Sequence, residues 1–310
     1  MKIEIINKKE YFDLLKQNNI NIPIYSDIEV FDTYPEIECL KVLHNNNEIA
    51  VFVYPINNNG VRREYRYYPY HSPILLKELD NIHQKEVYKC IFNYLFNKYD
   101  YTFIPLHPSF KVISGISSQN GFVEMRHTHV LESKLELYKV SSKLRNHINS
   151  ASKNVQIIID NDYSNYDFNE AIKGSKEEQI KRSNLTKKLL DNNKAITIKT
   201  LKDNKVIAGI VVIYDKEWSY LLHSYQKEKV RGVVPLLILN ATQYVFDNLK
   251  VKYFDFEGSV IDEIDDFFSS FDASITTYPY VIYSKDENEF IKLIKRSMNI
   301  EGRIKQYERD

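Results

Sequence analysis

Two segments of the chain repeat one pattern, and this repeat limits the fold more than any other feature. Residues 40–51 read LKVLHNNNEIAV and residues 198–209 read IKTLKDNKVIAG, a constant offset of 198 − 40 = 158. In both segments alternating apolar residues flank a turn that contains Asn or Asp, which is typical of a β-hairpin. The chain therefore contains either two similar hairpins or two copies of one domain.

The order of elements after each hairpin favours two copies. A third strand, a helix and an aromatic-rich strand follow in both halves, and the helix ends YLFNKY (from Tyr94) and YVFDNL (from Tyr244) are similar, at an offset of 244 − 94 = 150. We expect a tandem duplication with a first domain at residues 1–133 and a second at residues 134–310. Hydrophobic periodicity predicts helices at residues 8–17, 82–98, 109–119, 135–153, 166–192, 233–249 and 263–270, with Gly174 as a candidate break in the long helix at 166–192. It predicts strands at residues 38–44, 49–55, 61–68, 101–105, 122–131, 155–159, 195–201, 206–214, 218–224 and 253–256.

Composition narrows the class of protein. The 310 residues include 42 Lys+Arg and 42 Asp+Glu, so the formal net charge is zero and a strongly basic nucleic-acid binder is not indicated. The two cysteines, Cys39 and Cys90, do not form a disulfide framework, and the histidine spacing predicts no metal site. The longest apolar run, near residues 233–239, is too short to span a bilayer. We expect a cytoplasmic protein without a membrane span.

The order strand, hairpin, strand, helix, strand resembles the core of the GNAT acyltransferases. The resemblance implies an α/β fold of two tandem GNAT-like domains, each a mixed, mostly antiparallel sheet flanked by helices. In that fold the loop after the fourth strand opens a helix whose N-terminus receives the phosphates of the acyl donor. Here that loop begins the stretch QKEKVRGVVPLLIL at Gln226, and the implied cofactor-binding residues are Lys227, Lys229, Arg231 and Gly232. The alternative is a solvated loop that caps a core helix.

A narrower resemblance rests on four motifs. These are FDFEGS at residues 254–259, FFSSFD at 267–272, RHTHVLE at 126–132 and KLRNHINSASKN at 143–154. Together they resemble the Fem-type peptidoglycan aminoacyltransferases and their FemAB-like bacterial acetyltransferase relatives. The turn FFSSFD has no Lys, and Asp272 stands where that group has Gly.

Candidate site residues follow from acyl-transfer chemistry, which needs a neutral amine, a place for the oxyanion and a proton for the leaving group. The candidate catalytic residues are His223, Tyr225, Asp255 and Glu257. The candidate substrate-binding residues are Arg66, Tyr70, His71, Lys143 and Arg145. Alternatives stay open, since His223 is also compatible with a hydrogen-bonded strand position and the basic residues with a solvated helix face.

The resemblance implies an N-acyltransferase that moves an acyl group from acyl-CoA, as co-substrate, to an amine. The acceptor would be a small molecule or a nucleotide-linked or cell-envelope precursor. One alternative is a Fem-type enzyme that uses aminoacyl-tRNA, which the neutral net charge does not favour. The other is a binding protein that has the fold without catalysis.

Overall fold

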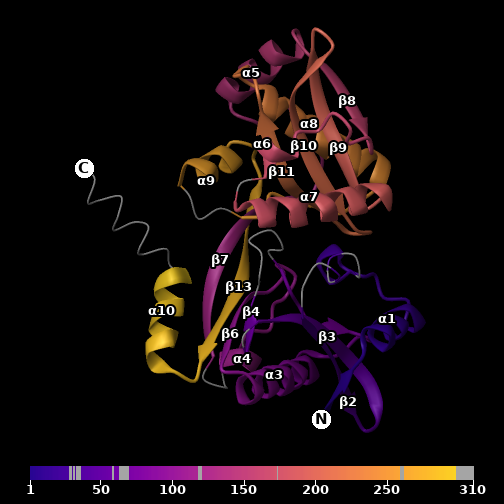
Figure 1. The fold of residues 1–310 in the computed structure, drawn as a ribbon, viewed down its shortest axis with the longest axis vertical. Coiled ribbons are helices and arrows are strands. Elements are labelled where there is room, and N and C mark those ends of the chain that lie inside the picture. Colours follow the sequence, from indigo (N-terminus) through magenta and orange to yellow (C-terminus); the bar gives the residue numbers. More distant parts are fainter. Residues whose placement is uncertain are drawn as a thin grey trace. The chain divides into compact units, whose positions relative to one another are not determined.

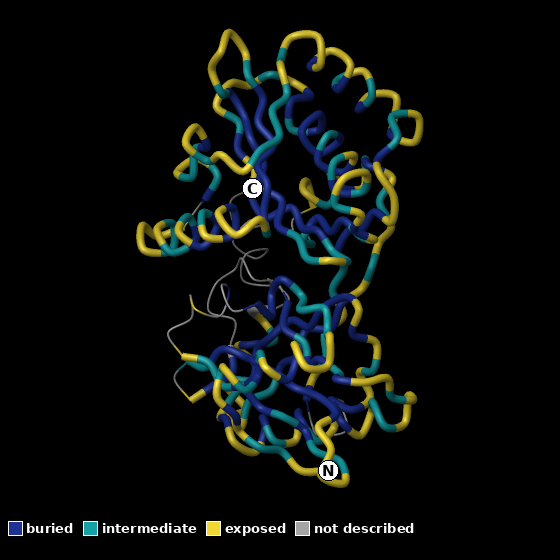
Figure 2. Tube along the Cα trace, turned by 90° about the vertical axis from the view of Figure 1, so that its right-hand side faces the viewer, coloured by how far each residue is buried: buried dark blue, intermediate teal, exposed yellow. Residues whose placement is uncertain are grey.

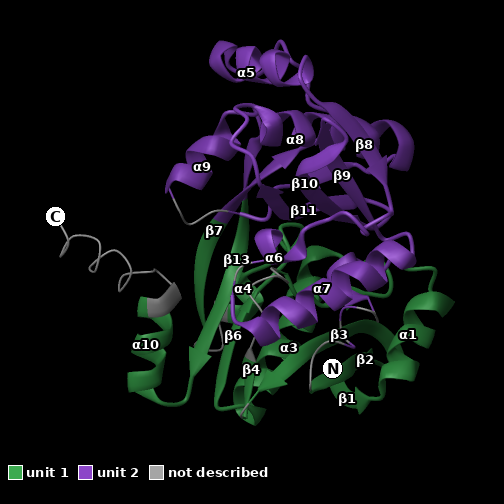
Figure 3. Cartoon of the chain, turned by 45° about the horizontal axis from the view of Figure 1, so that its top comes forward, with its two compact units in different colours: residues 1–20, 34–126, 277–310 green, residues 21–33, 127–276 purple. Residues whose placement is uncertain are grey.

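The computed structural model describes the chain except for residues 28–29, 31, 33–35, 58, 63–69, 118–120, 173, 259–261 and 298–310. The chain forms two compact units, coloured separately in Figure 3. Unit 1 comprises Met1–Ile20, Tyr34–Arg126 and Thr277–Asp310, and unit 2 comprises Asn21–Thr33 and His127–Thr276. The units differ from the division expected at residues 133/134, because each takes a segment from the other part of the sequence.

Unit 1 is built on a sheet in the order β1-β2-β3-β4-β6-β13 (Figure 1). Its elements are β1 (Lys2–Ile6), α1 (Lys8–Gln17), β2 (Ile37–His44), β3 (Asn47–Asn57), β4 (Gly60–Arg62), β5 (Ile74–Leu75), α3 (Asn81–Lys98), β6 (Tyr101–Pro105), α4 (Ser114–Ser117), the C-terminal part of β13 (Ser274–Ser284) and α10 (Glu287–Ser297). The Asp80 side chain caps α3 by accepting a hydrogen bond from the N–H of His83 at 2.9 Å. The apolar face of α3, with Val87, Ile91 and Leu95 at helical spacing, packs into the core of this sheet.

Unit 2 is built on a sheet in the order β7-β12-β11-β10-β9-β8. Its elements are the 3-10 turn η1 (Ile24–Ser26), the C-terminal part of β7 (Phe122–Leu131), α5 (Ser142–Ser152), β8 (Gln156–Asp160), α6 (Phe168–Ala171), α7 (Lys176–Asp191), β9 (Ala195–Lys202), β10 (Lys205–Tyr214), β11 (Trp218–Gln226), α8 (Val233–Tyr244), the π-turn η2 (Val245–Leu249), β12 (Tyr253–Asp255) and α9 (Asp262–Ser269).

Both faces of the central strands of unit 2 are buried, as the dark blue tube in Figure 2 shows. This explains why β10 reads as an almost continuous apolar run, VIAGIVVIY from Val206, instead of a strict alternation. Helices α8 and α5 pack on one face, where Ala208, Ile210 and Val212 join their core. Helix α7 contacts β9, and its Arg182 and Thr186 reach His223 of β11, which pairs with Val211 and so lies on the opposite face.

The two units repeat the same order of elements, as the sequence predicts. In unit 1 the hairpin β2–β3 is followed by β4, the two-residue β5, α3 and β6, and in unit 2 the hairpin β9–β10 is followed by β11, α8 and β12. The pairing directions repeat as well: both hairpins are antiparallel, whereas β4–β6 and β11–β12 are parallel pairs. The helix supplies the crossover that a parallel pair requires.

Several predicted boundaries were wrong. The helix expected at residues 166–192, with Gly174 as a candidate break, is divided there into α6 and α7, because Gly174 has a φ of 138° and Ser175 then starts α7 with a capping box to Glu178. The helix expected at 135–153 begins only at Ser142, capped by Ser141, and the one expected at 109–119 is the four-residue α4. Strands β1 and β13 were not expected, and most of the strand expected at 61–68 lies outside the described residues. Among the described helices, none has the length and apolar composition to cross a bilayer.

Candidate functional site

The end of strand β12 is built around the buried carboxylate of Asp255, whose exposed fraction is 0%. Its Oδ1 accepts a hydrogen bond from the Thr128 hydroxyl and another from the N–H of Glu257 at 2.7 Å. The Thr128 Oγ1 in turn accepts the N–H of Gly258 at 2.7 Å. Glu257 and Gly258 both have positive φ, at 65° and 71°. This conformation is unfavourable for Glu, and these hydrogen bonds stabilise the turn that contains it. Asp255 therefore positions Glu257.

Glu257 is partly buried and accepts a hydrogen bond from the hydroxyl of Tyr25. The ring of Tyr25 packs edge-on against Tyr220 of β11, with ring centroids 4.9 Å apart. Asp215 fixes the segment that carries Tyr25 by accepting the N–H of Ile24 at 3.0 Å. Sequence reasoning missed Tyr25, since a loop near residue 25 carries no pattern that assigns it to unit 2.

Strand β11 separates from β12 soon after the two meet. Their parallel pairing covers only three residue pairs, from Trp218–Tyr253 to Tyr220–Asp255, and β12 then follows β7 through the bond from Phe256 N to His129 O at 3.0 Å. Beyond Tyr220, β11 continues to Gln226 paired with β10 alone in the described part of the chain. The register with β10 also shifts between Val211 and Val212, so Leu222 has no counterpart and forms a bulge. Beyond Tyr220 this edge of β11 therefore has no strand partner among the described residues, although α6 contacts the strand.

His223 lies beside this bulge but is held inside unit 2. Its Nδ1 lies 3.2 Å from Nη2 of Arg182, and its Nε2 lies 3.2 Å from the Thr186 hydroxyl. Burial and the positive charge of Arg182 lower the pKa of His223 well below its usual range. A general base needs a pKa near the working pH, so this geometry favours a positioning role for His223.

Tyr225 lies farther along the same edge, and burial raises its pKa to about 12. It is therefore protonated at neutral pH and suited to donating a hydrogen bond. Its ring packs edge-on against Tyr166 at 4.8 Å, and a Cβ added at Gly209 would lie 2.8 Å from the Tyr225 ring. Because Gly209 has no side chain, there is space beside it for the rings of Tyr166 and Tyr225.

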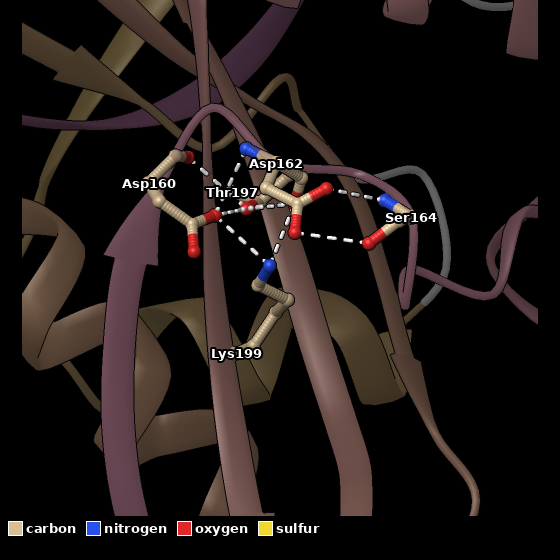
Figure 4. Close-up of polar contacts among 5 residues, drawn as sticks. All are labelled: Asp160, Asp162, Ser164, Thr197 and Lys199. Atoms are coloured by element: carbon tan, nitrogen blue, oxygen red, sulfur yellow. Dashed lines mark hydrogen bonds and ion pairs between the residues drawn. The ribbon is translucent and has the colours of Figure 1, made fainter.

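A polar cluster anchors the loop that carries Tyr166 (Figure 4). Lys199, only 3% exposed, pairs with Asp160 Oδ1 at 2.9 Å and donates to the backbone carbonyl of Asp162 at 2.6 Å. Thr197 donates to the same Asp160 Oδ1 at 2.8 Å, and the Asp162 carboxylate accepts the N–H of Ser164 at 2.8 Å. The buried cation thus has its compensating partners at the end of β8 and the start of the β8–α6 loop, and the Asp162 carboxylate then holds Ser164, two residues before Tyr166.

The basic loop before α8 has a left-handed Gly232, with φ 87°, at the helix N-cap. A Cβ at this position would lie 2.2 Å from the carbonyl oxygen of His147 in α5, so α5 fills the space that the glycine leaves. Lys227 forms an ion pair with Asp167 at 2.7 Å, and Lys229 is exposed. Burial lowers the pKa of His147, and the nearby charges of Arg231 and Lys143 add to this effect. Arg231 and Lys143 therefore both carry positive charge close enough to His147 to affect its pKa.

The other candidate substrate residues have structural partners. Arg145 donates from Nη2 to the backbone carbonyls of Tyr138 at 3.1 Å and Val140 at 3.2 Å, which braces the segment before α5. In unit 1, Tyr70 is 1% exposed and its ring contacts those of His107 and Tyr278, each at 5.2 Å. His71 is equally buried, and Arg66 lies outside the described residues.

Comparison with known proteins rests on structure, because no protein-family model and no curated protein match the sequence. The crystal structure of FemX matches with a TM-score of 0.60 and 9% identity, over 91% of this chain and 97% of that one. The structure of L-PGS from Bacillus licheniformis matches with a TM-score of 0.56 and 9% identity, over 96% and 97%. A tandem GNAT protein from the clavulanic acid biosynthesis pathway matches with a TM-score of 0.53 and 7% identity, over 91% and 98%. The chain has a tandem GNAT fold.

The predicted fold class and the resemblance to Fem-type members of the GNAT group are thus confirmed at the level of the fold. In GNAT terms β9, β10 and β11 of unit 2 precede the crossover helix α8, and β12 follows it.

Proposed function

We propose that the protein is an N-acyltransferase whose unit 2 binds an activated acyl donor where β11 parts from β12. The observation that carries this proposal is the separation of β11 from β12 after three residue pairs, with the bulge at Leu222 beside it. An extended, amide-bearing chain can add to such an edge as a further strand, and the pantetheine arm of acyl-CoA has this chemistry.

The charges near the start of α8 support the same donor. Arg231 and Lys143 both act on His147, and Lys229 is exposed in the same loop. Phosphates bind readily where basic side chains and a helix N-terminus meet. Lys227 contributes less, because Asp167 already neutralises it.

Glu257 is the residue we assign as the base that removes a proton from the acceptor ammonium. A carboxylate can accept this proton, and the Tyr25 hydroxyl and the Asp255-held turn fix its position at the end of β12. Tyr225, protonated at neutral pH, can donate a hydrogen bond to the leaving atom of the donor. The acceptor would be an amine of a small molecule or of a nucleotide-linked or cell-envelope precursor, and the chain would work in the cytoplasm of a bacterium.

A second candidate donor is aminoacyl-tRNA, as in Fem-type enzymes. One observation favours it: the space at Gly232, where a coenzyme A diphosphate would approach the backbone, is taken by the His147 carbonyl. The neutral net charge opposes it, because binding a polyanion calls for a basic surface.

Donor binding separates these alternatives. Acetyl-CoA, coenzyme A and bulk aminoacyl-tRNA are added to the purified chain, and the melting temperature and the calorimetric affinity are measured. Acetyl-CoA is expected to stabilise the protein, and R231A is expected to weaken its binding about 10- to 150-fold, the loss of one charge-assisted contact. The matched control is K216A, which removes an exposed Lys from the turn at the other end of β11. Stabilisation by tRNA alone would select the second donor, and stabilisation by neither would contradict an acyltransferase.

A further inference from the structure

Two histidines of β7 and one aspartate of α9 meet in unit 2, outside the residues assigned to acyl transfer. His127 and His129 are two positions apart on one strand, so their side chains lie on the same face. Each directs its Nε2 to the same oxygen, Oδ1 of Asp265, at 2.8 Å. The sequence predicted no metal, because Asp265 is 136 residues from His129 and spacing cannot reveal such a partner.

The potential ligand atoms of His127, His129 and Asp265 all lie within 4.8 Å of one another. Zinc–nitrogen bonds of about 2.0–2.1 Å at tetrahedral angles place neighbouring ligand atoms about 3.3 Å apart. Small side-chain rotations would therefore convert the present hydrogen bonds into a three-ligand site. Two imidazoles and one carboxylate suit Zn²⁺, Co²⁺ or Ni²⁺ better than Mg²⁺ or Ca²⁺, which prefer oxygen ligands.

Burial and charge also fit a cation. The His129 side chain is fully buried, whereas those of His127 and Asp265 are 41% and 32% exposed, so the cluster is closed on one side and open to water on the other. The open side leaves room for a water as a further ligand. The first turn of α9 carries three acidic residues, Asp262, Glu263 and Asp265, which attract a positive ion.

We propose that His127, His129 and Asp265 bind one divalent transition-metal ion that fastens helix α9 to strand β7. Helix α9 has only eight residues, and helices of this length are not stable alone in water. A metal bridge between α9 and β7 would supply a tertiary anchor. The proposal does not depend on the donor or the acceptor of the acyl transfer.

The test uses the tag-free full chain, treated with a chelator and dialysed. CoCl2 is titrated while the visible absorption of tetrahedral or five-coordinate cobalt is recorded, and ZnCl2 binding is measured by calorimetry. One equivalent is expected to bind and to raise the melting temperature. The variants H127Q and D265N, which alter the partly exposed ligands, are expected to lose at least 10-fold in affinity and to lose the absorption band. The control D266N makes the same charge change at an exposed neighbour in α9 and is expected to bind like the wild type.

Circular dichroism in the presence of chelator checks that each variant folds. Failure of the wild type to bind one equivalent, or unchanged binding in both H127Q and D265N, would overturn the proposal and leave a hydrogen-bonded triad. An equal loss in D266N would also overturn it, because general attraction by acidic residues would then explain the binding.

Discussion

Replacing Gly232 by Ala tests whether the glycine before α8 serves the protein's own packing or a phosphate of the donor. Gly232 has a φ of 87°, a conformation that costs an Ala about 1–2 kcal/mol. The new Cβ would also lie 2.2 Å from the His147 carbonyl, which belongs to a helix backbone and cannot rotate away. Overpacking of this kind costs about 1–3 kcal/mol. The expected loss of unfolding free energy is therefore about 2–5 kcal/mol.

The assay is urea denaturation followed by tryptophan fluorescence. Trp218 is the single tryptophan of the chain and lies in β11, so the signal reports on unit 2. The matched control is N204A at the exposed turn of the β9–β10 hairpin, where φ is 60° and the same backbone penalty applies without a neighbouring helix. N204A is expected to cost roughly 1 kcal/mol.

The comparison of the two variants decides the question. If G232A is no more destabilising than N204A, the contact with His147 does not determine the choice of glycine and the packing argument fails. If G232A is strongly destabilising but the folded variant binds the donor normally, the glycine serves packing. A loss of donor affinity with little change in stability would instead assign it to the donor site.

Two further predictions concern the proposed base and a buried histidine. E257Q is expected to reduce turnover about 10²- to 10⁴-fold with unchanged donor affinity, because the variant lacks the proposed base. The control D203N, at an exposed turn, is expected to leave turnover unchanged. Equal turnover in the two variants would refute the role of Glu257. Burial lowers the pKa of His107 from 6.5 to about 3, so the unfolded state binds the proton first and stability is lost as the pH falls below about 6.5. Between pH 7 and 5 the loss of unfolding free energy amounts to about 2 kcal/mol, at 1.36 kcal/mol per pH unit below 6.5. Urea denaturation at several pH values is expected to show that H107Q loses this part of the pH dependence.

The repeated hairpin allowed the fold to be predicted, because alternation and turn residues are local signals that tertiary structure rarely overrides. The hairpins, the crossover helices and the strands after them all lie close to their expected residues. Helix ends were harder, since they depend on capping: Gly174 indicated a break in the long helix, but the hydrophobic period does not mark Ser175 as the start of a new one. Strand β13 was missed because its partner β6 lies more than 150 residues earlier in the chain.

The candidate site was only partly predictable for the same reason. The sequence singled out Asp255 and Glu257, whose turn is local. It did not supply Thr128, Tyr25 or Arg182, which reach those residues and His223 from distant segments. In a sequence, a strand histidine that faces a substrate cannot be distinguished from one that faces a buried arginine. Only the fold distinguishes these two cases.

Each unit includes a segment from the other part of the sequence: residues 277–310 belong to unit 1 and residues 21–33 to unit 2. The two units are therefore built on one pattern but are not two independent copies joined end to end. Strand β13 pairs with β6 over five residues, from Tyr280–Pro105 to Ser284–Tyr101, so a fragment ending at residue 133 would expose the edge of β6. A fragment starting at residue 134 would lack Thr128, Tyr25 and the anchoring bond from Ile24 to Asp215. The turn that holds Glu257 therefore depends on residues from before the repeat boundary, and the second unit can only assemble the proposed base within the whole chain.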